Sequence, residues 1–300
     1  MLENISSIAQ FTMSDEEMPF LKQKKSFNLT SEEVGRISQI SFVLEPIAEK
    51  PGLTTRTKDL NSNLKLENFL VAGINVGDAF RKLAERIYEN NNLPITYDLA
   101  LQAQKDSFKN RIGTRLIYGG IISLFPLIIT QLRIQSTDPY EILDNIEGVL
   151  KQTHKEDTLY LQKLENFAYS HHKNHSKYMF TIKDDYKNIF DYYEKDLLNI
   201  QIPTSLEKAG FSTRAQQWSD RAKTGSSNKE ILNGYPILRS MLNIFFNDIK
   251  KNKSLGVSET AEEIDFLIRK AFPDVHIQWL ADLHVCLLYL IFSSNPKFVV

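Results

Sequence analysis

Apolar residues recur at spacings of three and four along most of the chain, the pattern of amphipathic helices that pack on a core. The first clear helix should begin after Thr30, because the Thr30 hydroxyl can accept from the backbone N–H of Glu33 while the Glu33 carboxylate reaches back. Lys50-Pro51-Gly52 is expected to end this helix, and its core-facing side is formed by Val34, Ile37, Ser41, Leu44 and Ile47.

A second apolar stripe runs from Leu66 to Ile87 and carries Gly73 and Gly77 one turn apart. This spacing lets another backbone or a ligand approach closely, although each glycine costs ~1 kcal/mol relative to alanine in a helix interior. The longest uncharged stretch, residues 116–132, has 17 residues and contains Pro126 and two glycines, whereas a membrane-spanning helix needs ~20 apolar residues. We therefore expect it to form a helix buried in the protein core.

Further helices are predicted over about 96–108, 186–197, 231–249 and 279–292. Another should begin at Asp138-Pro139-Tyr140-Glu141, which reads as an N-cap, a proline at the first helical position and a glutamate that completes the capping box. No stretch alternates cleanly in the manner of a strand. The predicted fold is all-α: an irregular arm over residues 1–28, then one domain over 29–300 with roughly ten helices around a buried central helix.

Charge excludes some function classes. The 36 basic and 37 acidic residues nearly cancel, so no global field would attract nucleic acid or an anionic membrane, and we predict neither as a partner.

The N-terminus lacks the basic start and apolar run of a signal peptide, which predicts a cytoplasmic protein. Cys286 lies in an apolar run and is expected to be a small buried hydrophobe. A homo-oligomer is left open.

Two clusters of ionisable residues are candidates for a metal site. His171, His172 and His175, with His154 upstream, form a histidine cluster, but the lysines and polar residues around it favour a solvated loop. Asp184-Asp185 suits Mg²⁺, yet adjacent acids at a helix start also favour the positive end of the helix dipole, and we favour that role. Glycine-rich phosphate loops and nucleophile elbows are missing, so standard motifs indicate no enzyme class.

One local pattern has basic residues placed around a turn. The segment from Glu45 to Arg56 reads Glu-Pro-Ile-Ala-Glu-Lys-Pro-Gly-Leu-Thr-Thr-Arg. Lys50 and Arg56 could clamp a polyphosphate, because lysine supplies a point charge and arginine a planar fork that suits phosphate oxygens. A plain turn that ends a helix is the alternative, and local physics alone favours it.

This segment resembles the first motif of the triphosphoribosyl-dephospho-CoA synthases, especially their shorter archaeal-type relatives. That family carries a Glu followed by Pro-Lys-Pro-Gly, then an acidic-aromatic stretch that leads to a Phe-Leu helix. The matching residues here are Glu45, Lys50-Pro51-Gly52, Arg56, Asp59 and 66–70, with the interval from Glu45 to Lys50 one residue shorter.

Two later segments extend the resemblance to about residues 32–295. The family's second motif, Asn-Thr-His-Lys-Gly or Asn-Thr-Asn-Xaa-Gly, opens a hydrophobic helix, as Arg115-Leu116-Ile117-Tyr118-Gly119 does here with Gly119 alone retained. The third motif is Pro-Gly-rich and then reads Ala-Asp-Leu before a long apolar helix. It resembles residues 275–283, which keep Ala281-Asp282-Leu283 and lack the glycines.

The resemblance implies a reaction that joins ATP to dephospho-CoA at the ribose 2′-hydroxyl and releases adenine, with Mg²⁺ expected. It also implies residue roles: Lys50, Gly52 and Arg56 would hold the triphosphate, and Glu45 and Asp282 would orient a ribose or Mg²⁺. Gly119 would admit a ligand closely. Arg115 would either take over phosphate binding or fill a disused pocket, which Trp279 could also plug.

Two functions follow from this resemblance. The first is a divergent, Mg²⁺-dependent transferase that uses ATP or a related nucleotide and a CoA-like or other alcohol acceptor. It predicts that Glu45, Lys50, Arg56, Gly119 and Asp282 converge on one pocket, within ~10 Å of one another. The alternative is a non-catalytic helical relative that binds a nucleotide or a protein partner. An all-α interaction protein unrelated to the family is a third interpretation.

Overall fold

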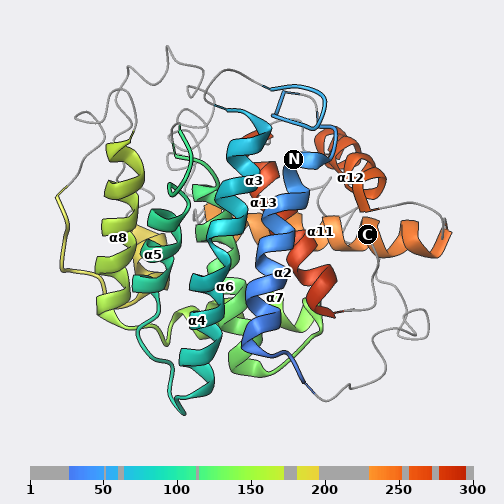
Figure 1. Ribbon diagram of the computed structural model, residues 1–300. Coiled ribbons are helices and arrows are strands. Elements are labelled where there is room, and N and C mark those ends of the chain that lie inside the picture. The colour runs from blue at the N-terminus through green and yellow to red at the C-terminus, as the bar shows by residue number, and fades with distance from the viewer. Residues whose placement is uncertain are drawn as a thin grey trace.

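The computed structural model describes residues 27–50, 52–59, 64–112, 115–171, 181–195, 230–251, 257–271 and 277–294. Across these residues the chain is helical and contains no strand, so the all-α prediction is confirmed. Figure 1 shows α2 and α4 side by side, with α5 and α8 on one flank and α11 and α12 on the other. In chain order the elements are α2 (Ser31–Leu44), the 3₁₀ turn η2 (Glu45–Ile47), α3 (Leu66–Asn75), α4 (Gly77–Tyr88), α5 (Tyr97–Asp106), α6 (Tyr118–Ile134), α7 (Pro139–Leu150), α8 (Lys155–Ser170), α9 (Ile189–Lys195), α11 (Glu230–Lys251), α12 (Val257–Ala271) and α13 (Ile277–Ser294).

Helix α2 starts as predicted and ends earlier. The Thr30 hydroxyl accepts from the Glu33 N–H at 3.2 Å, and the Glu33 carboxylate accepts from the Thr30 N–H at 2.8 Å, which completes the capping box. The helix stops at Leu44 rather than at the Lys50 turn. Pro46 explains the difference, because it has no N–H for the α-helical ladder and the chain tightens there into η2.

The apolar stripe from Leu66 to Ile87 forms two helices, not the single helix that its period indicates. The chain breaks at Val76, and the Gln39 side chain of α2 donates to the carbonyl of Ile74 there at 2.6 Å. Gly73 and Gly77 do admit a close neighbour, and that neighbour is α2. A Cβ on Gly73 would lie 2.9 Å from the Phe42 Cβ, and one on Gly77 would lie 2.3 Å from the Gln39 Cδ.

Helix α6 is the buried central helix. Nearly all its residues from Gly120 to Leu132 are inaccessible to solvent, and Pro126 lies within it. Phe125 of α6 continues an aromatic row with Phe80 and Phe42, whose successive ring centroids are 5.8 and 6.0 Å apart. Helix α13 packs along α6, where the Tyr289 hydroxyl donates to the Gln131 side chain at 2.8 Å.

Of three local predictions, the structure confirms those for Asp138 and Cys286 and contradicts the one for Glu141. Asp138 caps α7 as predicted, since its carboxylate accepts from the Tyr140 N–H at 2.8 Å. Glu141 does not complete the box: it accepts from the Ser136 hydroxyl at 2.6 Å, and Ser136 in turn accepts from the Asp138 N–H. Cys286 is fully buried, as predicted, and burial raises its pKa well above the usual value.

No helix within the described part of the chain has the length and apolar character needed to cross a membrane.

Candidate active site

The start of helix α6 is an uncapped helix N-terminus. Ile117, in the N-cap position, adopts a left-handed conformation with φ 50°, and no side chain of its own segment caps the helix. The first turn, Tyr118-Gly119-Gly120, contains no acidic residue. The leading N–H groups of a helix have no partner within it and carry partial positive charge, so this end favours an anionic group.

The carboxylate of Asp282, from α13, lies directly against Gly119. A Cβ placed on Gly119 would be 1.8 Å from the Asp282 Oδ2 and 2.4 Å from its Cγ. No side chain larger than hydrogen fits there while Asp282 keeps this position. Gly119 and Asp282, which sequence analysis selected separately, therefore meet, and the group that Gly119 admits closely in this structure is the protein's own carboxylate.

Arg115 joins this pair from the segment before α6. Its guanidinium carbon lies 4.2 Å from the ring centroid of Tyr169 and 5.4 Å from that of Tyr118. Burial disfavours the charged form, but Tyr169, Tyr118 and the Asp282 carboxylate outweigh it, so the pKa of Arg115 is raised and it stays a cation. One terminal nitrogen, Nη1, is buried without a hydrogen-bond partner among the described residues.

The hydroxyl of Tyr118 contacts a buried carboxylate, that of Glu165. Glu165 of α8 is almost inaccessible, and it accepts from the hydroxyl of Tyr192 of α9 at 2.5 Å and from that of Tyr118 at 3.4 Å. Burial, and next the negative charge of Glu165, raise the pKa of Tyr118 well above its usual value. Glu165 and Tyr169 were not predicted from the sequence. The available signal was a glutamate on the core face of an amphipathic helix, in register with Leu161 and Ala168.

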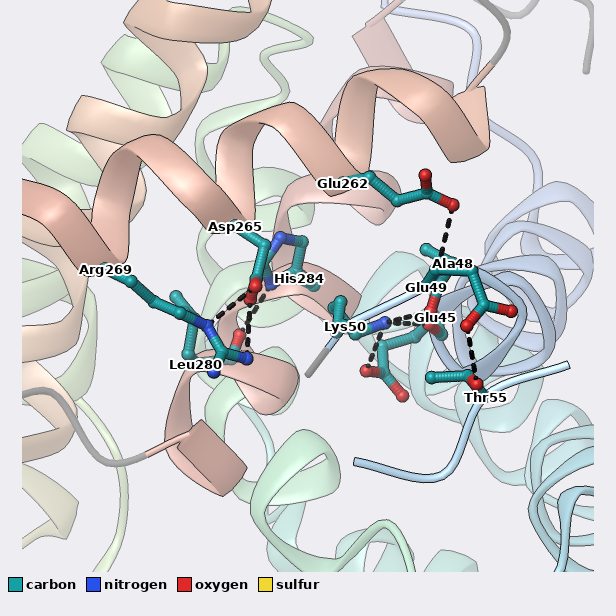
Figure 2. Close-up of polar contacts among 10 residues, drawn as sticks. All are labelled: Glu45, Ala48, Glu49, Lys50, Thr55, Glu262, Asp265, Arg269, Leu280 and His284. Carbon is teal, nitrogen blue, oxygen red and sulfur yellow. Dashed lines mark hydrogen bonds and ion pairs between the residues drawn. The ribbon is translucent and has the colours of Figure 1, made fainter. Parts of the chain in front are cut away.

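Lys50 and Glu45 form a second group, shown in Figure 2. The Lys50 ammonium is fully buried and lies 3.0 Å from the Glu45 Oε1. It also donates to the Glu45 carbonyl and, at 3.5 Å, to the carbonyl of Ala48. Because backbone carbonyls at a helix end need donors, Lys50 closes the end of η2 and holds the Glu45 carboxylate at the same time.

The next residues form an outward turn. Gly52 is exposed at φ 84°, a conformation that favours glycine, beside a bond from the Leu53 N–H to the Lys50 carbonyl at 3.2 Å. Arg56 is half exposed, with its Nε 3.4 Å from Glu49 and its Nη2 3.8 Å from Glu262 of α12. Asp59 accepts from the Leu66 N–H at 2.9 Å, which caps α3.

Helices α2 and α13 connect the two groups. The ring of Phe42, one turn before Glu45, touches Gly120, since a Cβ there would lie 2.6 Å from the Phe42 Cε1. In α13, Asp282 stands at Gly119, and the ring of His284, two positions later, lies in the electrostatic reach of Lys50. Two helical positions are about 200° apart, so these side chains leave α13 on different faces. That all five predicted residues line one pocket stays a prediction.

The histidine and Asp-Asp clusters take structural places where they are described. His154 is the N-cap residue of α8, and His171 follows the end of α8, where the His171 Nδ1 lies 2.9 Å from the Phe167 carbonyl. His172 and His175 lie outside the described residues. The side chain of Trp279 also lies outside the described part of the structure. Asp184-Asp185 was predicted at a helix start, which is wrong: both lie in coil before α9, and Asp184 pairs with Lys155 at 2.9 Å. Within the described residues no three His, Cys, Asp or Glu side chains gather as a metal site.

Comparison with protein families places these residues in context. Residues 31–188 match the model of the ATP:dephospho-CoA triphosphoribosyl transferases, which covers just over half of the chain. The chain belongs to this family. The matched segment holds Glu45, Lys50, Arg115, Gly119 and Glu165, and it ends before α13 and Asp282. Neither the curated proteins nor the solved structures gave a match.

Proposed function

We propose that this protein is a divergent triphosphoribosyl-dephospho-CoA synthase that depends on Mg²⁺, takes ATP or a related nucleotide, and uses a CoA-like or other alcohol as acceptor. Membership in the transferase family supports the reaction class. The observation that carries the proposal is the meeting of Arg115, Gly119 and Asp282 at the start of α6, because they lie in two segments that resemble separate motifs of the family, although Gly119 alone is retained in the first of these.

The start of α6 has the groups that a polyphosphate needs. Its leading N–H groups favour an anion, and the Arg115 Nη1 is a buried donor with no partner among the described side chains. We assign the first phosphate contact to Arg115 for this reason. Lys50 and Arg56 each already face carboxylates, so they would have to exchange them for phosphate oxygens to play the same role.

Asp282 would orient the ribose or Mg²⁺, and Glu45 would assist from the start of η2. One carboxylate suits Mg²⁺, which commonly binds one or two protein carboxylates together with substrate phosphates and waters. The ion would supply charge neutralisation at the phosphates, while Arg115 and the α6 N-terminus hold them in position.

The test is chromatographic detection of free adenine after incubation with ATP, Mg²⁺ and dephospho-CoA, with EDTA in a parallel reaction. Arg115→Gln should reduce kcat/KM for ATP about 10- to 100-fold, the usual effect of losing a charged hydrogen bond. Arg111→Gln is the matched control, because Arg111 is another arginine that lies over an aromatic ring, that of Phe108 at 4.5 Å. Lys50→Ala tests whether Lys50 and Glu45 contribute to adenine release separately from Arg115, Gly119 and Asp282.

The same experiment decides between the two functions. Adenine release that needs Mg²⁺ and Arg115 supports the transferase. No release from a folded protein that binds ATP in calorimetry would remove the family's reaction and favour the non-catalytic relative. The place of Asp282 against Gly119 favours this alternative, since a disused pocket would also present a carboxylate of the protein packed against the first turn of α6.

A further inference from the structure

One face of α12 carries three charged side chains, and one of them reaches the segment after η2. Glu262, Asp265 and Arg269 are spaced by three and four residues, so they share a helical face. Figure 2 shows Glu262 extended to the backbone of Glu49, while Asp265 and Arg269 pair with each other beside His284. We call residues 48–50 and 52–59 the motif loop, because they carry most of the family's first motif. Helix α12 lies far outside the matched segment 31–188.

Glu262 binds both the backbone and a side chain of the motif loop. Its Oε1 accepts from the Glu49 N–H at 2.9 Å and lies 3.8 Å from the Arg56 Nη2. Glu49, fixed in this way, uses its own Oε2 to accept from the Thr55 hydroxyl at 2.9 Å and the Thr57 hydroxyl at 2.8 Å. A single carboxylate of α12 therefore anchors the residue around which the rest of the loop is arranged.

The same face of α12 also lies near Lys50, the buried residue of the motif loop. Asp265 pairs with Arg269 at 2.7 Å, and the charge of Lys50 acts on both Asp265 and His284. Glu49 and Lys50 are adjacent, so a shift of the Glu49 backbone away from α12 would also move Lys50 and the Glu45 carboxylate that Lys50 holds. The contact of Glu262 with Glu49 is therefore linked through the chain to Lys50 and Glu45.

We propose that Glu262 is a positioning residue: through the Glu49 N–H it holds the motif loop against α12, so a helix outside the matched segment completes the site. It acts on the loop and not on the reactants. The consequence for activity rests on the proposed function, whereas the docking of the loop does not.

Limited proteolysis with trypsin measures the docking directly. Arg56 and Lys58 are exposed in the motif loop, while Lys50 is buried and precedes Pro51, so cleavage after Arg56 or Lys58 reports on the loop. Glu262→Ala should accelerate this cleavage about fivefold, the effect of one lost hydrogen bond on a local opening equilibrium. Glu263→Ala, at the exposed neighbouring position, should leave the rate unchanged. Glu262→Gln should stay near the wild-type rate, because its amide oxygen can still accept from Glu49.

Adenine release gives the second readout. Glu262→Ala should raise KM for ATP or lower kcat, Glu262→Gln should recover most of the loss, and Glu263→Ala should behave as wild type. Equal cleavage rates in the two alanine variants would overturn the proposal, and so would faster cleavage spread over the whole chain, which indicates global destabilisation. A wild-type protein that releases no adenine would remove the proposed function, and the proteolysis would still decide whether Glu262 holds the loop.

Discussion

His284 should make the stability of this protein fall at mildly acidic pH. Its imidazole is 1% exposed on α13, and its Nδ1–H donates to the Leu280 carbonyl at 2.9 Å. Burial, and next the positive charge of Lys50, lower its pKa from 6.5 to about 3. The folded protein therefore keeps His284 neutral well below the pH at which a histidine in the unfolded chain takes up a proton.

The sign and size of the effect follow from linkage. A histidine in the unfolded chain takes up a proton as the pH falls below 6.5, and the buried ring does not do so until about 3, so the unfolded state is favoured progressively between these values. Between pH 7.5 and pH 5.0, His284 alone should cost about 2 kcal/mol of unfolding free energy.

Urea unfolding at pH 7.5 and 5.0, for the wild type and for His284→Asn, measures this contribution. Asparagine places an N–H near the position of Nδ1 and does not titrate, so the variant should lose about 2 kcal/mol less than the wild type between the two pH values. The comparison uses only this difference, which cancels the other titrating groups. If both proteins lose the same stability, or if NMR finds the ring protonated at pH 5, the reasoning is refuted.

Three further substitutions test contacts that organise the fold and the site. Gly119→Ala should displace Asp282, lower the free energy of unfolding by about 1–3 kcal/mol and reduce adenine release. Gly148→Ala in α7, with nothing within 4 Å, should instead stabilise the protein by about 1 kcal/mol. Chemical denaturation of both variants separates the effect of the clash from that of helix propensity. Asp157→Ala should cost about 3 kcal/mol or more, because the buried carboxylate accepts from the Thr96 and Tyr97 N–H groups, which joins α5 to α8, and from the His154 N–H at the start of α8 itself. An unchanged denaturation midpoint would contradict this. Thr30→Ala should cost about 1 kcal/mol through loss of the α2 capping box, with the same assay and Ser31→Ala, just outside the cap, for comparison.

Local chemistry sufficed to predict several elements of the fold. The Thr30–Glu33 capping box, the Asp138-Pro139 start of α7 and the uninterrupted apolar stretch of α6 are decided by residues within one or two helical turns of each other. Such signals involve few residues and short distances along the chain, so their outcome depends little on the rest of the molecule. The resemblance to the transferase family was also detectable from short motifs, and the family match confirmed it.

The contacts that make the candidate site were decided by tertiary structure. Periodicity shows which face of α6 or α13 is buried, but not which helix crosses it or at what height, so it could not predict that Asp282 lies on Gly119 or that Glu165 accepts from Tyr118. The same limit explains the break at Val76, where Gln39 of another helix binds the Ile74 carbonyl, and the inward turn of Lys50. The sequence by itself determined where α2 and α7 begin and that α6 is buried. Only the packing of the helices decided which charged groups meet, because a buried charge takes its partner from whichever element lies against it.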